Sequence, residues 1–189
     1  MPPIRKFERE DIINVAYDVI KNEGMEAINA RRIAKELNSS VQPIFHNFSN
    51  MEELKSSVLD KIYNTYVEYM NNGAADKNSY KGMGLAYINF AKDYPNFFKI
   101  FFMNESKLSP DNFIQNDNVG NDVLKNGQSF TGLSMEEQKK FHLKVWILTH
   151  GIATMVASKT VDFSDGQIEE LLTDTTRELL IGFKSMGGK

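Results

Sequence analysis

Apolar side chains recur at helical spacing through most of this chain, and this periodicity limits its fold more than any other feature. Residues 8–23 carry apolar side chains three or four positions apart, with polar side chains on the opposite side. The same spacing returns in residues 80–94, 134–158 and 164–184. No segment shows the strict apolar and polar alternation of a half-buried strand. The sequence therefore predicts an all-α fold of about nine helices.

Residues that start and stop helices divide the N-terminal third. Gly24 follows the first helical segment and can take the positive φ that often ends a helix. Asn29 is a good N-cap for the short sequence ARRIAKEL. A second helix is therefore predicted over residues 30–37.

A turn cluster comes after that second helix. Residues 38–40 read Asn-Ser-Ser, where the asparagine tolerates positive φ and Ser40 can cap the next helix. A third helix is predicted to begin at Val41. Pro43 is compatible with it, because backbone N–H groups in the first turn have no intrahelical partner to lose.

A fourth helix is predicted after these three. Asn50 and Glu53 resemble a capping box, with asparagine in place of the usual serine or threonine. The helix should run to about Met70. Residues 71–79 are small and polar, which is typical of a loop, and Pro95 ends the following helix or starts the next one.

The C-terminal half contains two long helical segments. Ser134 and Glu137 form a capping box at the start of the first. A coiled-coil-like seam then runs through Phe141, Val145, Leu148, Ile152 and Met155. The last helix carries one apolar stripe at Ile168, Leu171, Leu172, Leu179 and Phe183. The first of these helices is apolar on several faces and should be buried from two directions.

Two middle segments differ strongly in composition. The sequence NFFKIFFMNE predicts a short, largely buried helix with four phenylalanines, at Phe97, Phe98, Phe101 and Phe102. Residues 104–133 are rich in Asn, Ser, Gly and Asp and predict only a weak helix around 113–128.

Composition and charge exclude several classes of protein. The chain has no cysteine, so it has no disulfide framework, thiolate metal site or cysteine nucleophile. It has no signal-like apolar start and no run of roughly 18 apolar residues, so we expect a cytoplasmic protein without a membrane partner. The net charge of −3 gives no overall attraction for nucleic acid. Nucleic-acid binding would need a local arrangement of donors.

An ordered set of residues between positions 8 and 60 nevertheless carries a family resemblance. Its members are Gly24, Ile33-Ala34, Ser40, Ile44-Phe45, Phe48 and Glu53-Leu54. This set resembles the DNA-binding domain of the tetracycline-repressor (TetR) family of bacterial transcription regulators. The resemblance implies a helix-turn-helix motif at residues 29–48 within a domain of residues 1–50. A linking helix, 51–70, would join it to a ligand-binding and dimerisation domain of residues 71–189.

The sequence departs from the usual pattern of that family at four positions. Asn38 replaces the turn glycine, Ser39 a hydrophobic residue, Phe45 a tyrosine and Met51 a lysine. The tyrosine and the lysine typically contact phosphates in the family. Residues 1–60 also hold only eight Lys and Arg against ten acidic residues. Recognition should therefore lean on Gln42, on helix termini and on the avidity of a dimer.

A second resemblance lies in the sequence VWILTHGIATMVA. Trp146, His150 and Gly151 are similar to the Trp-His-Gly signature of one type of TetR C-terminal domain. The resemblance implies a homodimer formed through helices 134–158 and 164–184. It also implies that the middle helices enclose a pocket for a small-molecule effector of unknown identity.

The second helix of a helix-turn-helix lies in the major groove of its operator, a double-stranded DNA site, and neighbouring segments hold the phosphates. The candidates are Asn29, Arg31, Ser40, Val41, Gln42, Pro43, Phe45, His46 and Lys55, with Arg5 and Lys6 as further phosphate contacts. Gln42 can pair with an adenine edge, whereas Val41 and Pro43 offer apolar contact, for instance to a thymine methyl. Two alternatives stay open: Gln42 and His46 are merely exposed polar residues, and Phe45 packs in the core.

Candidates for an effector pocket are aromatic. They are Tyr87, Phe90, Tyr94, Phe101, Trp146 and His150, and a plain core explains most of them equally well. Trp146 and His150 are the stronger candidates, because polar tips within an apolar helix need partners. The other histidines, His46 and His142, supply no metal-ligand spacing, so no metal and no cofactor is expected.

Other classes of function have less support. The sequence has no Gly-rich phosphate loop, no nucleophile elbow and no HExxH motif, so no catalytic residue is assigned and an enzyme is not expected. Paired carboxylates such as Glu52-Glu53 complement helix N-termini instead. The expected function is a ligand-responsive repressor that binds a pseudo-palindromic operator as a dimer. The main alternative is a helical protein–protein adaptor that does not bind DNA.

Overall fold

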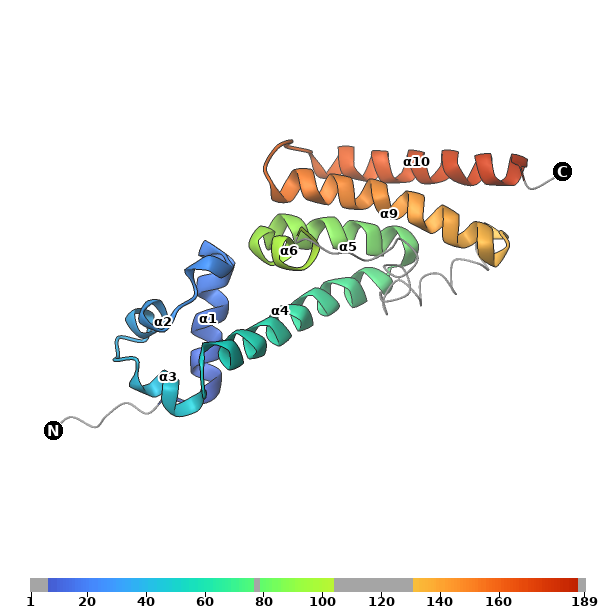
Figure 1. Cartoon of the computed structure of the whole chain (residues 1–189). Helices are drawn as coiled ribbons and strands as arrows, with labels where there is room; N and C mark the ends of the chain where they lie inside the picture. Colours follow the sequence, from blue (N-terminus) through green and yellow to red (C-terminus); the bar gives the residue numbers. More distant parts are fainter. Residues whose placement is uncertain (1–6, 77–78, 104–130, 187–189) are drawn as a thin grey trace. The chain divides into compact units, whose positions relative to one another are not determined.

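The computed structural model describes residues 7–76, 79–103 and 131–186 (Figure 1). These residues form eight α-helices and one short 3-10 helix, and they contain no strand. The predicted all-α class is therefore confirmed. Arg5, Lys6 and the weak helix expected around 113–128 lie outside the described residues.

Contacts divide the described chain into two compact units. The first contains helices α1 to α3, the part of α4 up to Tyr66, and residues Asn96–Phe102. The second contains Val67–Pro95 together with α9 and α10. The boundary thus lies inside α4, and the phenylalanine-rich segment groups with the N-terminal helices although it is distant in sequence.

Local signals determine the helix ends of the first unit. Its elements are α1 (Arg9–Glu23), a 3-10 helix (Met25–Ala27), α2 (Ala30–Glu36), α3 (Gln42–Asn47) and α4 (Met51–Ala74). Gly24 ends α1 with φ 89° and ψ 173°, a positive φ that is outside the left-handed helical region. Asn29 caps α2, because its side-chain oxygen accepts the Arg32 N–H at 3.0 Å. Asn38 has φ 49°, so it takes the place of a turn glycine.

The first unit has a continuous apolar core. Side chains with 0% exposure come from α1, α2, α3, α4 and α6 (Pro95–Phe102), and they include Ile12, Ile20, Ile33, Ile44, Leu54, Ile62, Phe97 and Phe98. The expected burial of the phenylalanine-rich helix is confirmed for Phe97 and Phe98, whereas Phe101 and Phe102 are half-buried. Pro95 is the first residue of α6, where a proline fits a helix start.

Helix α4 starts at Met51 as predicted, but its capping bonds and its end differ from the prediction. The Glu53 N–H donates to the Asn50 side-chain oxygen at 2.9 Å, but the Glu53 carboxylate accepts from the Ser49 N–H rather than from Asn50. The predicted cap by Asn50 is therefore present, and only the reciprocal bond of the capping box goes to the preceding residue. The helix also continues to Ala74, beyond the expected end near Met70.

A glycine pair brings the last turn of α4 against α5 (Ser79–Asp93). A Cβ on Gly73 would lie 2.5 Å from the Gly82 carbonyl oxygen, and a Cβ on Gly82 would lie 2.2 Å from that of Gly73. The two backbones can approach this closely only without side chains. The first part of the expected loop is therefore a helical turn packed on α5.

The second unit is built from three helices beside one another: α5 (Ser79–Asp93), α9 (Met135–Ala157) and α10 (Asp165–Met186) (Figure 1). Helices α5 and α9 run in the same direction, since Tyr80 bonds His142 and Tyr87 bonds His150. The ion pairs Lys81–Glu169 and Lys92–Asp165 join α5 to α10.

Helix α9 starts as predicted, because Ser134 and Glu137 form the expected capping box. The apolar seam predicted along this helix differs in part from the buried stripe that the structure shows. The buried stripe consists of Gln138, Phe141, Val145, Thr149, Ile152, Ala153 and Ala157. Met155, expected in the seam, is 42% exposed, and Leu171 of the predicted α10 stripe is also exposed. The stripe follows the 3.6-residue period of a straight helix more closely than a heptad.

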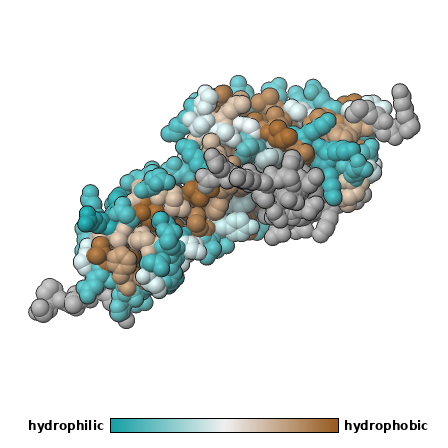
Figure 2. All heavy atoms as spheres, viewed as in Figure 1, coloured by the Kyte–Doolittle hydropathy of each residue, from teal (hydrophilic) through white to brown (hydrophobic). Residues whose placement is uncertain are grey.

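The surface of the described helices is mainly hydrophilic, with hydrophobic side chains showing over parts of α9 and α10 (Figure 2). Among the described residues, no helix is both long and apolar enough to cross a membrane.

Candidate nucleic-acid interface

The turn between α2 and α3 positions the candidate DNA contacts. The Ser40 hydroxyl accepts the Gln42 N–H at 3.3 Å, and α3 begins at Gln42, with Val41 as the residue before it. The predicted start at Val41 is therefore one residue early. Positive φ at Asn38 reverses the chain so that α3 leaves α2 at an angle, which is the helix-turn-helix arrangement.

Helix α3 has one buried side and one exposed side. Ile44 and Phe48 are 0% and 2% exposed, and they pack into the core of the first unit. We call the exposed side the reading surface. It consists of Ser40, Val41, Gln42, Phe45 and His46, which are exposed, and Pro43, which is half-buried.

Phe45 belongs to this exposed side. Its side chain is 50% exposed, so it does not fill the core, which was one of its two predicted roles. Val41 is 36% exposed. The reading surface therefore combines apolar groups with the Gln42 amide and the His46 ring, a mixture that suits base edges and thymine methyls.

Arg9 of α1 fixes the end of α3 against α4. Its guanidinium donates to the Asn47 carbonyl at 2.8 Å and pairs with Glu53 at 2.9 Å, and it lies 4.1 Å from the centre of the Phe48 ring. The Ser49 N–H, together with Arg9, holds the pKa of the Glu53 carboxyl below its usual value. Sequence reasoning did not single out Arg9, because its partners lie about 40 residues away.

The Asn47 side chain supplies a second link. Its amide nitrogen donates to the Pro43 carbonyl at 2.9 Å and to the Phe7 carbonyl at 3.2 Å. These bonds join α3 to the residues just before α1. The orientation of the reading surface is thus set by side chains that would not themselves touch DNA.

The cationic candidates differ in how they are engaged. Arg31 is exposed at the start of α2. Its neighbour Arg32 pairs with Glu23 at 2.5 Å and with Glu36, and these bonds raise the pKa of its guanidinium. Lys55 is half-buried and pairs with Glu52 at 2.9 Å. Exposed pairs of this kind contribute little stability, so Lys55 can exchange its partner at small cost.

Asn29 has a structural role in addition to its predicted contact with DNA. Its oxygen caps α2, and its nitrogen donates to the Ala27 carbonyl at 3.2 Å. The exposed side chain can still meet a phosphate, but a contact there stays a prediction.

Five of the six aromatic candidates for an effector pocket lie in the second unit, where the rings of Tyr87 and Trp146 contact His150 and that of Phe90 contacts Tyr94. Tyr87 and Phe90 are buried, and Tyr94, Trp146 and His150 are half-buried, all in the second unit. Phe101 belongs to the first unit, where its ring meets Tyr63. Their role in ligand binding stays a prediction.

His150 has a hydrogen-bond partner for its polar ring, and Trp146 stacks on it. Their rings stack with centroids 4.8 Å apart, and the Tyr87 hydroxyl lies 3.0 Å from Nδ1 of His150. Burial lowers the pKa of the His150 imidazole. Within the described ranges, no group of His, Asp and Glu side chains is arranged to hold a metal ion.

Comparisons with known proteins place these features in a family. Residues 12–58 match the model of the bacterial regulatory proteins of the tetR family. This match contains α2, the turn and α3, which together carry the reading surface. A search of curated protein sequences gives no match.

Solved structures resemble the chain over nearly its whole length. A protein of unknown function from Rhodococcus sp. RHA1 has a TM-score of 0.69 at 17% identity, covering 97% of this chain and 99% of that one. A TetR-like transcriptional regulator from the same organism gives 0.57 at 12% identity, covering 99% and 100%. A single-residue variant of TetR from Acinetobacter baumannii AYE, in complex with minocycline, gives 0.59 at 14% identity, covering 97% and 100%.

At these identities the structural matches show a common fold, and the family assignment comes from the N-terminal match. The helix-turn-helix domain of this chain is thus of the type found in the tetR family of bacterial regulatory proteins.

Proposed function

We propose that the protein is a sequence-specific DNA-binding transcription regulator that acts as a homodimer on a pseudo-palindromic operator and responds to a small molecule. The observation that carries the proposal is the reading surface. Helix α3 buries Ile44 and Phe48 and leaves Val41, Gln42, Phe45 and His46 exposed within a segment that matches the family model. A helix that only stabilised the core would not need two exposed apolar side chains.

Base contacts would come from the first turn of α3. Gln42 is exposed and can form two hydrogen bonds with an adenine edge. Val41 and Phe45 would pack against thymine methyls or sugars beside it. Phosphates would be held by Arg31, His46 and Lys55, with Asn29 at the start of α2.

The outward faces of α9 and α10 would form the dimer interface. Ile147 is 57% exposed and Met155 42% exposed on α9, and Ile181 is 62% exposed on α10. Gly151 lies one turn from both Ile147 and Met155, and a Cβ there would meet nothing within 4 Å. Exposed apolar side chains beside small residues allow two helices to pack closely, and a second copy of the chain would bury them.

A ligand would act by favouring one spacing of the two reading surfaces. Helix α4 is continuous from Met51 to Ala74, and its residues belong to the first unit up to Tyr66 and to the second from Val67. A change in the second unit can therefore be passed along one helix. The ligand need only bind one arrangement more tightly than the other.

The experiment must distinguish a DNA-binding regulator from the alternative, a protein–protein adaptor that does not bind DNA. The protein would be incubated with a pool of random double-stranded DNA, and bound sequences would be recovered and enriched. The proposal predicts a pseudo-palindrome with an adenine in each half-site.

Gln42→Ala is the informative variant in this selection. It should lose the preference at the adenine position, because each bidentate contact contributes about 1–3 kcal/mol of discrimination. Asn64→Ala, at an exposed position of α4, should select the wild-type sequence. Enrichment of no sequence at low salt, with wild type and Gln42→Ala behaving alike, would favour the adaptor.

A further inference from the structure

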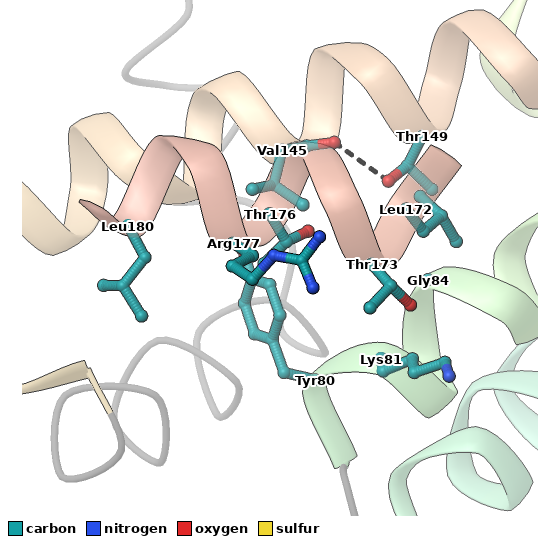
Figure 3. Close-up of a pocket in the computed structure, with 10 residues that line it drawn as sticks. All are labelled: Tyr80, Lys81, Gly84, Val145, Thr149, Leu172, Thr173, Thr176, Arg177 and Leu180. Atoms are coloured by element: carbon teal, nitrogen blue, oxygen red, sulfur yellow. Dashed lines mark hydrogen bonds between the residues drawn. The ribbon is translucent and has the colours of Figure 1, made fainter. Parts of the chain in front are cut away.

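The second unit contains a cavity that none of the predicted pocket residues lines. It has a volume of about 260 Å³ and lies between α5, α9 and α10. Its lining residues are Tyr80, Lys81, Gly84, Val145, Thr149, Leu172, Thr173, Thr176, Arg177 and Leu180. Figure 3 shows Tyr80, Lys81 and Gly84 on α5, Val145 and Thr149 on α9, and the other five lining residues on α10. Sites for drug-sized ligands measure roughly 300–1,000 Å³, so this one suits a smaller molecule.

Gly84 keeps the cavity open. A Cβ there would lie 3.6 Å from Cδ1 of Leu172 and 4.0 Å from the Thr149 hydroxyl, which are ordinary contact distances. No close approach therefore requires a glycine, in contrast to Gly73 and Gly82. A glycine inside a helix is less favourable than alanine, so Gly84 lowers helix stability while leaving space at this wall.

The walls are apolar, and the polar groups gather on α10. Val145, Leu172 and Leu180 supply aliphatic surface, whereas Thr173 and Thr176 bring hydroxyls. The buried Thr149 hydroxyl already donates to the Val145 carbonyl at 2.9 Å, as the dashed line in Figure 3 shows. An apolar molecule with a single polar end fits this distribution.

Arg177 gives that polar end its charge. Its guanidinium pairs with Asp174 at 2.6 Å, and its side chain is 63% exposed. An exposed pair of neighbouring residues on one helix contributes little, so the guanidinium can turn to a ligand anion at small cost. Lys81 adds a second cation to the lining, although it pairs with Glu169 at 2.5 Å. An arginine matches the two oxygens of a carboxylate.

The charged end of the cavity borders the proposed dimer interface. On α10, the lining residues Thr173 and Thr176 lie beside the buried Leu172, whereas Arg177 lies one turn before the exposed Ile181. Ligand binding and dimer formation would therefore involve neighbouring surfaces of the same helix.

We propose that this cavity binds a small apolar carboxylate, with the aliphatic body against Val145, Leu172 and Leu180 and the carboxylate held by Arg177 and the threonine hydroxyls of α10. The inference rests on the proposed function only in giving this ligand a regulatory effect. Binding itself is measured without DNA, so failure of DNA recognition and failure of this site are distinguishable.

Calorimetric titration of the full-length protein with octanoate tests the site. Octan-1-ol has the same chain length and no charge, and its affinity should be at least about tenfold lower than that of octanoate. Octylamine should not bind measurably. Arg177→Gln should weaken octanoate by about tenfold and leave octan-1-ol unchanged. Absence of octanoate binding, or equal affinity for octanoate and octan-1-ol, would overturn the proposal.

Two glycine variants test the location. Gly84→Met extends a flexible side chain into the cavity and should abolish octanoate binding, whereas Gly166→Met, at a position open to solvent on α10, should not change it. If Gly84→Met fails to fold, Gly84→Ala fits the ordinary contact distances and should weaken binding while raising the melting temperature. Equal octanoate affinity in wild type and the folded Gly84 variant would contradict this site.

Discussion

The reading surface of α3 and the outward faces of α9 and α10 both expose apolar side chains, but in different settings. Phe45 lies on a six-residue helix beside Gln42, His46 and Ser40, so polar groups surround it. Ile147 and Ile181 lie on helices of 23 and 22 residues and have glycines near them. The first surface suits a partner with mixed donors, acceptors and methyl groups, such as a DNA groove, and the second suits a copy of itself.

The largest expected effect on operator binding comes from placing glutamates at exposed apolar positions of α9 and α10. The double variant Ile147→Glu, Ile181→Glu should be monomeric in light scattering, because two carboxylates per subunit would have to be desolvated in the interface. Loss of the paired reading surfaces should weaken operator binding by about 100- to 10,000-fold. Val161→Glu is the control, since Val161 is also exposed, at 39%, but lies in the loop that joins α9 to α10. A dimeric double variant would disprove the proposed interface.

Neighbouring residues on α3 should respond in opposite ways. Ile44→Ala should lower the free energy of unfolding by about 2–5 kcal/mol, because it leaves a cavity in the core. Phe45→Ala should change it by no more than about 0.5 kcal/mol. Chemical denaturation measures both values.

The operator affinity of Phe45→Ala completes this pair. It should fall, because an apolar contact with DNA is lost while the fold is intact. A strongly destabilised Phe45→Ala would mean that the ring supports the core after all.

The cap of α2 should have a smaller effect. Asn29→Ala removes the acceptor for the Arg32 N–H and should cost about 1 kcal/mol in thermal unfolding. Asn29→Ser retains a capping oxygen and should stay close to wild type. If both variants bind operator equally well, Asn29 acts only as a cap. If both lower the affinity and only Asn29→Ala lowers stability, Asn29 also contacts DNA.

The smallest effect concerns His150 in the second unit. Burial lowers its pKa in the folded protein below the ordinary value of 6.5, so the unfolded chain takes up a proton first as pH falls. Its contribution to stability is complete above pH 6.5 and is lost as the pH falls through the lower folded value. The stability difference between wild type and His150→Gln should therefore shrink on acidification. A His150 pKa of 6.5 or higher by NMR titration would contradict this.

Features that depend on residues close together in the chain could be predicted from the sequence. The Asn29 cap, the positive φ of Asn38 and the Ser134–Glu137 box each depend on residues within a few positions of one another, and all three are observed. The reading surface depends on them in turn, because the turn determines which side of α3 faces outward.

Contacts between distant segments explain what the sequence did not reveal. Arg9 joins α1 to residues about 40 positions away, and the Gly73–Gly82 crossing depends on two helices meeting. Met155 could not be recognised as exposed, because a helix with apolar residues on several sides does not show which side meets its neighbours. The cavity beside Gly84 likewise needs three helices in place.

The central claim is that two reading surfaces engage one DNA site together. It is tested most directly by measuring binding to the selected operator and to the same operator with five base pairs inserted between its half-sites. Five base pairs are about half a helical turn, so the second half-site would face away from its reading surface. Simultaneous engagement of both half-sites predicts a loss of about 100-fold or more in affinity. Equal affinity for the two operators would contradict it.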